Sequence, residues 1–146
     1  MAAQLKGLGS DKSLYLCDTF RGIPKAGVHD TLKGGEYADC SADGVRTLLA
    51  SLGVTATILE GVFPDENGEQ VTGPIAMCHI DVDVYQSGKD IVAWLEPRTA
   101  PGAIVVFDDF GFSGAPGIAR LGNELKQHAG WLFMHNLNGH GVMVRL

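Results

Sequence analysis

Short apolar runs alternate along the chain with segments in which apolar residues recur every three or four positions. Four of the runs have the length and composition of strands, at residues 14–17, 57–60, 75–82 and 103–107. The runs at 75–82 and 103–107 are almost continuously apolar, which is typical of strands buried on both faces of a sheet. We therefore expect both of them in the interior of a sheet.

Helical spacing predicts three amphipathic helices between and after these strands. Ser41 is suited to cap the start of the first helix, and Gly53 stands where a C-terminal cap belongs. The apolar residues at helical spacing are Val45, Leu48, Leu49 and Leu52 in the first helix, Ile91, Trp94 and Leu95 in the second, and Ile118, Leu121 and Leu125 in the third. A short helical piece also precedes the first strand and ends near Gly9.

The Gly- and Pro-containing segment 21–40 and the end of the chain have other patterns. Gly and Pro favour a long loop over 21–40, and loops of that length are usually functional or mobile. Asn138-Gly139 is a hairpin-type turn signal between two strand-like runs, 131–135 and 141–145. Strand, helix, strand, helix, strand and a terminal hairpin predict an α/β fold with a mostly parallel sheet and an antiparallel edge.

Length and composition limit the class of protein. The 146 residues fit one domain, 1–146, and 45% hydrophobic with 19% charged residues is typical of a folded soluble protein. No apolar run approaches the roughly 20 residues of a membrane span, and residues 1–9 lack the apolar stretch of a signal peptide, so we expect a cytoplasmic protein with no membrane partner. The 11 Lys and Arg residues are scattered and the net charge is −6, which favours a small-molecule partner over nucleic acid.

Neither the cysteines nor the histidines have the spacing of a metal site. The cysteines are Cys17, Cys40 and Cys78, and the histidines considered are His79, His135 and His140. Two of the cysteines lie in apolar runs, which favours buried, reduced thiols over disulfides. We expect His79 to be a core residue and the other two histidines to be surface residues.

Acidic residues follow three of the predicted strands. Asp18 ends the first strand, Asp81 and Asp83 end the third, and Asp108 and Asp109 follow the fourth. Ligands of open parallel sheets bind beyond the carboxyl ends of the strands. Carboxylates gathered there repel one another unless a cation neutralises them, and their oxygens suit Mg²⁺ or another hard cation. We expect Asp81, Asp108 and Asp109 to bind it, and Asp83 to cap the helix that follows.

Three blocks of the sequence resemble the signature motifs of the macrocin O-methyltransferase family. They run from His79 to Tyr85 (HIDVDVY), from Pro101 to Phe110 (PGAIVVFDDF) with Pro116-Gly117 beyond it, and from Asp18 to Pro24 (DTFRGIP). The resemblance covers nearly the whole chain. It implies a Rossmann-like class I methyltransferase sheet, mostly parallel with a C-terminal antiparallel hairpin. It also implies an enzyme that uses S-adenosylmethionine and a divalent metal, usually Mg²⁺, to methylate a hydroxyl of a sugar or phenolic natural product.

The same resemblance implies roles by position. The matching metal ligands are Asp81, Asp108 and Asp109, and the residues matched to the cofactor are Asp18, Ser41, Gly61 and Val62. Asp81 also matches the position proposed as the general base. Asp18 matches the acidic residue that hydrogen-bonds the cofactor ribose, whereas the other three cofactor residues are placed near the adenine by their position in that fold.

The front of the chain departs from the family pattern. Residues 1–9 resemble only the end of the helix that follows the family's central first strand and Gly-rich turn, so the resemblance implies a shortened member that lacks both. One alternative hypothesis is a catalytically impaired domain that binds or oligomerises. Another is a nucleotide-sugar transferase with Asp81-Val82-Asp83 as its metal-diphosphate motif. The strands beside the missing one must pair directly or associate with another chain. We expect a homo-oligomer, with a dimer as the first choice, and weak or absent binding of S-adenosylmethionine by this chain alone.

Overall fold

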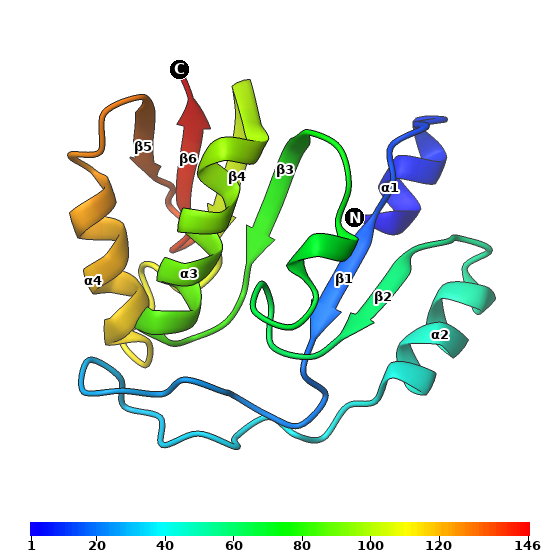
Figure 1. Ribbon diagram of the computed structural model, residues 1–146, viewed down its shortest axis with the longest axis horizontal. Coiled ribbons are helices and arrows are strands. Elements are labelled where there is room, and N and C mark those ends of the chain that lie inside the picture. The colour runs from blue at the N-terminus through cyan, green and yellow to red at the C-terminus, as the bar shows by residue number, and fades with distance from the viewer. The chain divides into compact units, whose positions relative to one another are not determined.

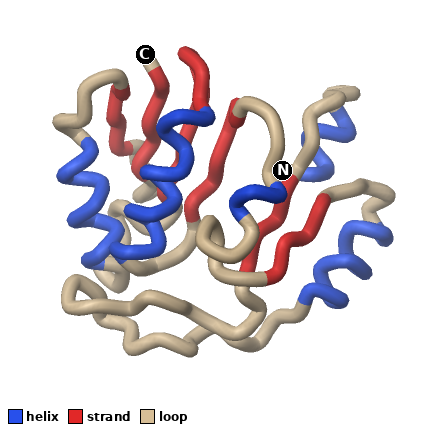
Figure 2. The backbone as a smooth tube through the Cα atoms, viewed as in Figure 1, coloured by secondary structure: helices blue, strands red, loops and turns tan.

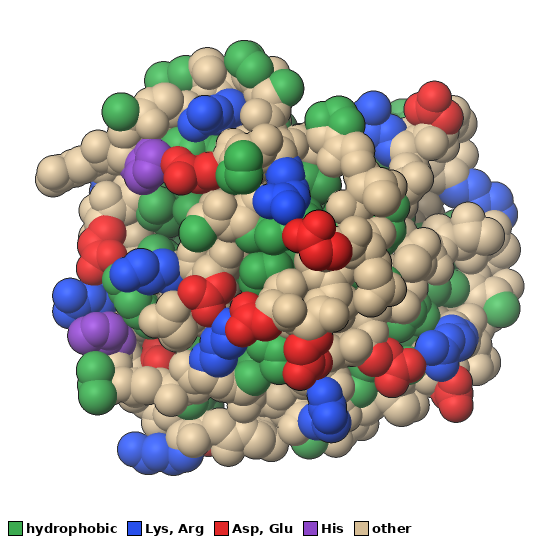
Figure 3. Space-filling view, viewed as in Figure 1, with side chains coloured by type: hydrophobic (Ala, Val, Ile, Leu, Met, Phe, Trp, Pro, Cys, Tyr) green, Lys and Arg blue, Asp and Glu red, His purple; other side chains and the backbone are tan.

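The structure is a computed structural model that describes residues 1–146, and the backbone forms two compact units. Unit 1 comprises Met1–Gly22 and Tyr37–Val71, and unit 2 comprises Ile23–Glu36 and Thr72–Leu146. Figure 1 shows the ribbon and Figure 2 the same backbone coloured by secondary structure. Acidic and basic side chains are interspersed over the face seen in Figure 3. None of the helices combines the length and the hydropathy that a membrane span requires.

Unit 1 is built around a two-stranded parallel sheet. Its elements are α1 (Ala2–Gly7), β1 (Tyr15–Asp18), α2 (Ala42–Ser51), β2 (Thr57–Glu60) and the short 3₁₀ turn η1 (Gly68–Gln70). β1 and β2 pair in register from Tyr15 opposite Thr57 to Asp18 opposite Glu60. The predicted cap of α2 is confirmed, because Ser41 Oγ accepts a hydrogen bond from the Gly44 N–H at 3.2 Å.

Unit 2 contains the larger sheet and the terminal hairpin. Its elements are β3 (Ile75–Ile80), α3 (Tyr85–Leu95), the 3₁₀ turn η2 (Glu96–Arg98), β4 (Thr99–Phe107), α4 (Pro116–Leu125), β5 (Trp131–His135) and β6 (Gly141–Arg145). The strand order is β3-β4-β6-β5, with β3 parallel to β4 and the β4–β6 and β6–β5 pairs antiparallel. The predicted α/β fold, with parallel strands and a C-terminal hairpin, is confirmed.

The hydrophobic core lies in unit 2, between this sheet and the two helices on one of its faces. Figure 1 shows α3 and α4 on the same side of the sheet. The largest fully buried side chains all belong to this unit and are Phe107, Leu95, Ile118, Met143, Val84 and Val105. Val105 and Phe107 are two residues apart on β4 and therefore face the helices together, as side chains alternate along a strand.

The opposite face of the same sheet is apolar but uncovered. Its exposed side chains are Met77, Ile104, Leu132 and Met134, from 39% to 49% exposed. The prediction that the 75–82 strand is buried on both faces is therefore wrong, because both helices of unit 2 lie on one face. The strand also ends at Ile80, before the acidic residues. Within the sheet of unit 2, β3 pairs with β4.

The cysteines differ from expectation in one respect. All three are free thiols, but Cys17 and Cys40 are exposed and Cys78 is half-buried. The full burial predicted from the apolar runs is not reached, because the strands that carry Cys17 and Cys78 lie in incompletely covered sheets.

The long loop predicted over 21–40 contains no helix or strand. Its central part, Ile23–Glu36, belongs to unit 2 and is held there by hydrogen bonds. Asp30 Oδ1 accepts from the Tyr85 N–H at the start of α3, at 2.9 Å. Thr31 Oγ1 donates to the Gly114 carbonyl at 2.7 Å, and the Lys25 ammonium lies 2.6 Å from Asp90. These contacts place the loop against the N-terminal ends of α3 and α4.

Candidate functional site

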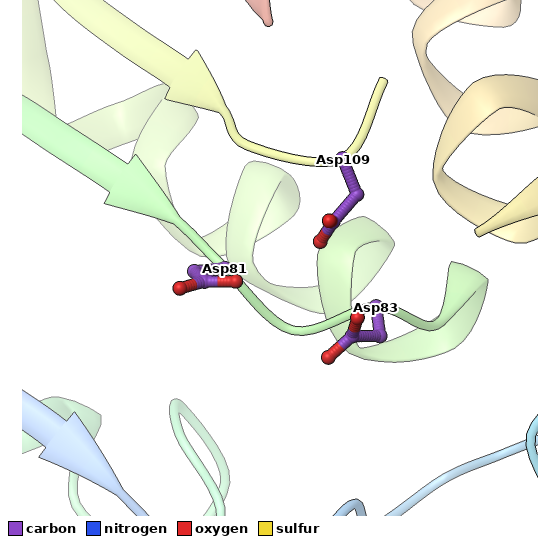
Figure 4. A group of neighbouring side chains, drawn as sticks. All are labelled: Asp81, Asp83 and Asp109. Atoms are coloured by element: carbon purple, nitrogen blue, oxygen red, sulfur yellow. The ribbon is translucent and has the colours of Figure 1, made fainter. Parts of the chain in front are cut away.

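Three carboxylates converge where β3 and β4 end. One carboxylate oxygen from each of Asp81, Asp83 and Asp109 lies within 4.8 Å of the other two. Figure 4 shows the Asp109 side chain pointing from the segment after β4 toward the segment after β3 that carries Asp81 and Asp83. The sequence prediction that acidic residues gather beyond these strands is borne out for Asp81 and Asp109, and Asp83 joins them.

Asp83 is held in the group by a tight turn. The Val84 N–H donates to the Val82 carbonyl at 2.6 Å, and Asp83 between them has a φ of +58°. This is a γ-turn of the rare, strained kind with a positive φ at its central residue. The expectation that Asp83 caps α3 is wrong, because Asp30 accepts from the Tyr85 N–H instead. Strained backbone of this kind concentrates at functional sites.

Asp109 is positioned by aromatic residues on either side of it. Phe107 is fully buried in the core, and Phe110 is 6% exposed, with its ring edge against Phe133 at 5.0 Å between centroids. A side chain at Gly122 would collide with the Phe110 ring, and one at Gly141 would collide with the Phe133 ring that packs against it. Because both flanking rings are buried, the backbone at Asp109 is tied to the core of unit 2.

The electrostatics of the group are unfavourable in the absence of a counter-charge. Burial, followed by the neighbouring carboxylates of Asp83, Asp81 and Asp108, raises the pKa of Asp109 to about 6. The pKa of Asp83 is also raised, first by burial and then by Asp81 and Asp108. Asp109 Oδ2 is buried and has no hydrogen-bond partner. An orphaned carboxylate oxygen among two other carboxylates fits a hard divalent cation, which binds oxygen ligands.

Asp108 lies outside this group. Its Oδ1 is 2.9 Å from His140 Nε2 and 3.4 Å from His79 Nε2. The expected ligand set of Asp81, Asp108 and Asp109 therefore differs from the carboxylates that converge. Asp108 continues the alternation of β4 and falls on the face of the sheet that carries His79, whereas the chain turns at Asp109. His140, expected as a plain surface residue, was missed because its partner is distant in sequence.

The residues predicted to bind the cofactor lie in unit 1, where β1 and β2 end. Asp18 is the last residue of β1, and its Oδ1 accepts from the Phe20 N–H at 2.7 Å. The Gly61 N–H donates to the Asp18 carbonyl at 2.9 Å. Gly61 has a φ of +137°, a conformation that requires glycine. The structure thus brings Asp18 and Gly61 together.

The other two predicted cofactor residues have local roles of their own. The Ser41 side chain caps α2, where its Oγ accepts from the Gly44 N–H. The Val62 N–H donates to Glu66 Oε2 at 2.9 Å, and a side chain on Gly61 would strike the same oxygen. Glu66, which the sequence analysis did not single out, therefore shapes the turn after β2.

Comparisons with known proteins bear on the same segments. A family model described as macrocin-O-methyltransferase (TylF) matches residues 1–131. The chain is 27% identical over 122 residues to an 8-demethyl-8-(2,3-dimethoxy-alpha-L-rhamnosyl)-tetracenomycin-C 4′-O-methyltransferase of Streptomyces olivaceus, over 75% of this chain and 47% of that protein. It thus spans about half the length of this curated relative.

Solved structures show the same fold at low sequence identity. The O-methyltransferase NovP matches with a TM-score of 0.82 and 19% identity, over 97% of this chain and 63% of that one. TomG of Streptomyces achromogenes, an O-methyltransferase solved in complex with SAM, matches with a TM-score of 0.63 and 16% identity, over 92% of this chain and 62% of that one. Because the family model extends over most of the sequence and includes β1 to β4 with their acidic ends, the chain belongs to the macrocin-O-methyltransferase family.

Proposed function

We propose that this chain carries the cation site and part of the cofactor site of an S-adenosylmethionine-dependent O-methyltransferase that acts on a hydroxyl of a sugar or phenolic natural product. The observation that carries the proposal is the convergence of carboxylate oxygens from Asp81, Asp83 and Asp109, together with a buried oxygen of Asp109 that has no hydrogen-bond partner. Family membership supports methyl transfer to oxygen. The name of the Streptomyces olivaceus relative, a methyltransferase of a rhamnosyl compound, supports a sugar hydroxyl.

The proposed ligands of the divalent cation, Mg²⁺ or another hard ion, are Asp81, Asp83 and Asp109. This set exchanges the expected Asp108 for Asp83, because Asp83 contributes an oxygen to the group and Asp108 faces two histidines. A cation bound there would lower the pKa of a coordinated hydroxyl and orient it. The three carboxylates come from two strand ends of one well-packed sheet, so their spacing is set before any ligand binds.

The acceptor hydroxyl loses a proton when it is methylated, and a carboxylate beside it can accept that proton. Asp81 is the residue that the family resemblance assigns to this role. Methyl transfer otherwise depends on in-line placement of the two substrates, which is a matter of positioning.

The proposed contact of unit 1 with S-adenosylmethionine is made by Asp18, whose carboxylate would accept hydrogen bonds from the ribose hydroxyls. Its position at the end of β1 and the orientation given by the Phe20 N–H support this role. Ser41, Gly61 and Val62 stay proposed neighbours of the adenine, and the absence of a side chain at Gly61 leaves the end of β2 open to a ligand. The TomG complex with SAM supports the choice of cofactor.

The test is titration calorimetry with Mn²⁺, with S-adenosylmethionine and with a nucleotide sugar, on the wild-type chain and on Asp109→Asn. We expect Mn²⁺ binding that Asp109→Asn abolishes, while Asp43→Asn, an exposed carboxylate on α2 that pairs with Arg46, leaves it unchanged. Wild-type protein without Mn²⁺ binding would contradict the cation site. Binding of the nucleotide sugar in place of S-adenosylmethionine would favour a glycosyl transferase.

We also propose that the chain self-associates. The sheet of unit 2 has an apolar face, formed by Met77, Ile104, Leu132 and Met134, that is exposed. Exposed apolar faces favour association. Sedimentation equilibrium is expected to show a dimer, and a monomer at all concentrations would contradict the proposal.

A further inference from the structure

The turn between β5 and β6 carries a chain of hydrogen bonds that ends on Asp108. Asn136 Oδ1 accepts from the backbone N–H groups of Asn138 and His140, each at 2.9 Å. Asn136 Nδ2 lies 3.1 Å from His140 Nδ1. His140 Nε2 lies 2.9 Å from Asp108 Oδ1, and the contact of His79 with the same oxygen is longer, at 3.4 Å. His140 is therefore the principal partner of Asp108.

The partners of Asn136 determine which nitrogen of His140 carries the proton. An amide oxygen only accepts hydrogen bonds, and Oδ1 of Asn136 receives two backbone N–H groups. The amide group that faces His140 is consequently the NH₂, which donates. His140 Nδ1 must then accept, so the neutral imidazole holds its proton on Nε2 and donates it to Asp108.

The turn is also fixed against the segment that follows β4. The Gly111 N–H donates to the Gly139 carbonyl at 2.6 Å. A side chain on Gly111 would lie 2.8 Å from Gly139 Cα, so this close approach of the two backbones requires glycine at position 111. This contact and the His140 hydrogen bond together tie one turn to the segment with Asp108 and Asp109.

We propose that His140 is a positioning residue of the cation site: held by Asn136 as an Nε2–H donor, it fixes the Asp108 carboxylate beside the ligand group. The inference rests on the cation site proposed above. A carboxylate with one oxygen held by an oriented donor keeps a single direction, whereas an Asp108 left with only the longer His79 contact would rotate next to Asp109 and disturb its spacing. Partners outside the ligand group commonly affect metal affinity in this way.

The first experiment measures Mn²⁺ dissociation constants of the full chain by electron paramagnetic resonance. His140→Ala is expected to weaken Mn²⁺ binding roughly 10- to 100-fold, the range found when such partners are removed. His140→Gln should restore most of the affinity, because its side-chain NH₂ can still donate to Asp108. His128→Ala is the matched control, since His128 Nε2 is 3.0 Å from Glu96 in another histidine–carboxylate pair, and it should not change the affinity.

The second experiment is nitrogen NMR of the imidazole groups in the wild-type protein without metal. We expect His140 as the neutral Nε2–H tautomer, a result that does not depend on whether any variant folds. The other tautomer would overturn the proposal, as would wild-type affinity for Mn²⁺ in His140→Ala. Absence of Mn²⁺ binding by the wild-type chain would contradict the cation site itself and this role of His140 with it. Mn²⁺ binding that His140→Ala leaves unchanged would contradict the role of His140 alone.

Discussion

The two sheets of this protein end in acidic residues, but they differ in how those residues are supported. The four-stranded sheet of unit 2 packs on α3 and α4 and contains all the largest buried side chains. In unit 1 the buried hydrophobic residues are Ala42, Val54 and Leu59, around two short strands. Two strands alone are marginal, and a larger packed sheet holds a site more rigidly. The carboxylate group is thus on the more rigid of the two supports.

The acidic residues themselves also differ. Asp18 in unit 1 accepts a hydrogen bond from a neighbouring backbone N–H, whereas Asp109 in unit 2 has a buried oxygen without a partner beside Asp81 and Asp83. An acidic residue at the end of a strand therefore does not by itself indicate a cation-binding site. The crowding and the missing partner are what single out the site in unit 2.

The largest expected effect separates chemistry from cofactor binding. Asp81→Asn should reduce turnover roughly 10²- to 10⁴-fold, because it removes a cation ligand and the proposed proton acceptor. The affinity for S-adenosylmethionine should change much less. Steady-state kinetics and calorimetry measure the two, and a loss confined to cofactor affinity would contradict the role of Asp81.

The next prediction tests the difference in packing. Phe107→Ala in the core of unit 2 should lower the free energy of unfolding by about 3–5 kcal/mol. Leu48→Ala on α2, where the side chain is 58% exposed, should change it by less than about 0.5 kcal/mol. Urea unfolding followed by circular dichroism gives both values, and similar losses in the two variants would remove the contrast between the units.

Asp18→Ala should show the reverse of the Asp81 result. If its carboxylate binds the ribose hydroxyls, the variant loses about 1.5–3 kcal/mol of binding free energy for S-adenosylmethionine. Mn²⁺ affinity should stay as in the wild type. Calorimetric titration of each ligand provides the comparison, and unchanged affinity for the cofactor would exclude Asp18 from that site.

The smallest effect concerns stability against pH without a cation. Because its pKa is raised from 3.8 to about 6, Asp109 stabilises the fold below the lower value, and this contribution is lost as the pH rises through about 6. The groups around it are Asp83, Asp81, Asp108 and His140. With chelator present, the melting temperature should fall between about pH 4 and about pH 6.5, and the fall should be smaller in Asp109→Asn. An equal fall in both proteins would count against this assignment.

Local patterns predicted most of the elements. β2, β5 and β6 have the expected bounds, and Ser41 caps α2 as its position before the apolar repeat indicated. The burial of β3 was not predictable in the same way. A continuous apolar run is compatible with two covered faces, but the number of covered faces depends on where the helices pack, and α3 and α4 lie together.

The sequence by itself determined the order of strands and helices, the terminal hairpin and the gathering of acidic residues at strand ends, because turn residues, caps and apolar periodicity act over a few positions. Only the tertiary structure decided which of those residues converge. Asp30, which is 55 residues away from Tyr85 in the sequence, accepts the hydrogen bond from the first N–H of α3. Asp83 therefore does not cap the helix, and its carboxylate lies beside those of Asp81 and Asp109. His140 reaches Asp108 from a turn built later in the chain, so that carboxylate is held outside the group. Both outcomes depend on long-range hydrogen bonds, which no local pattern encodes.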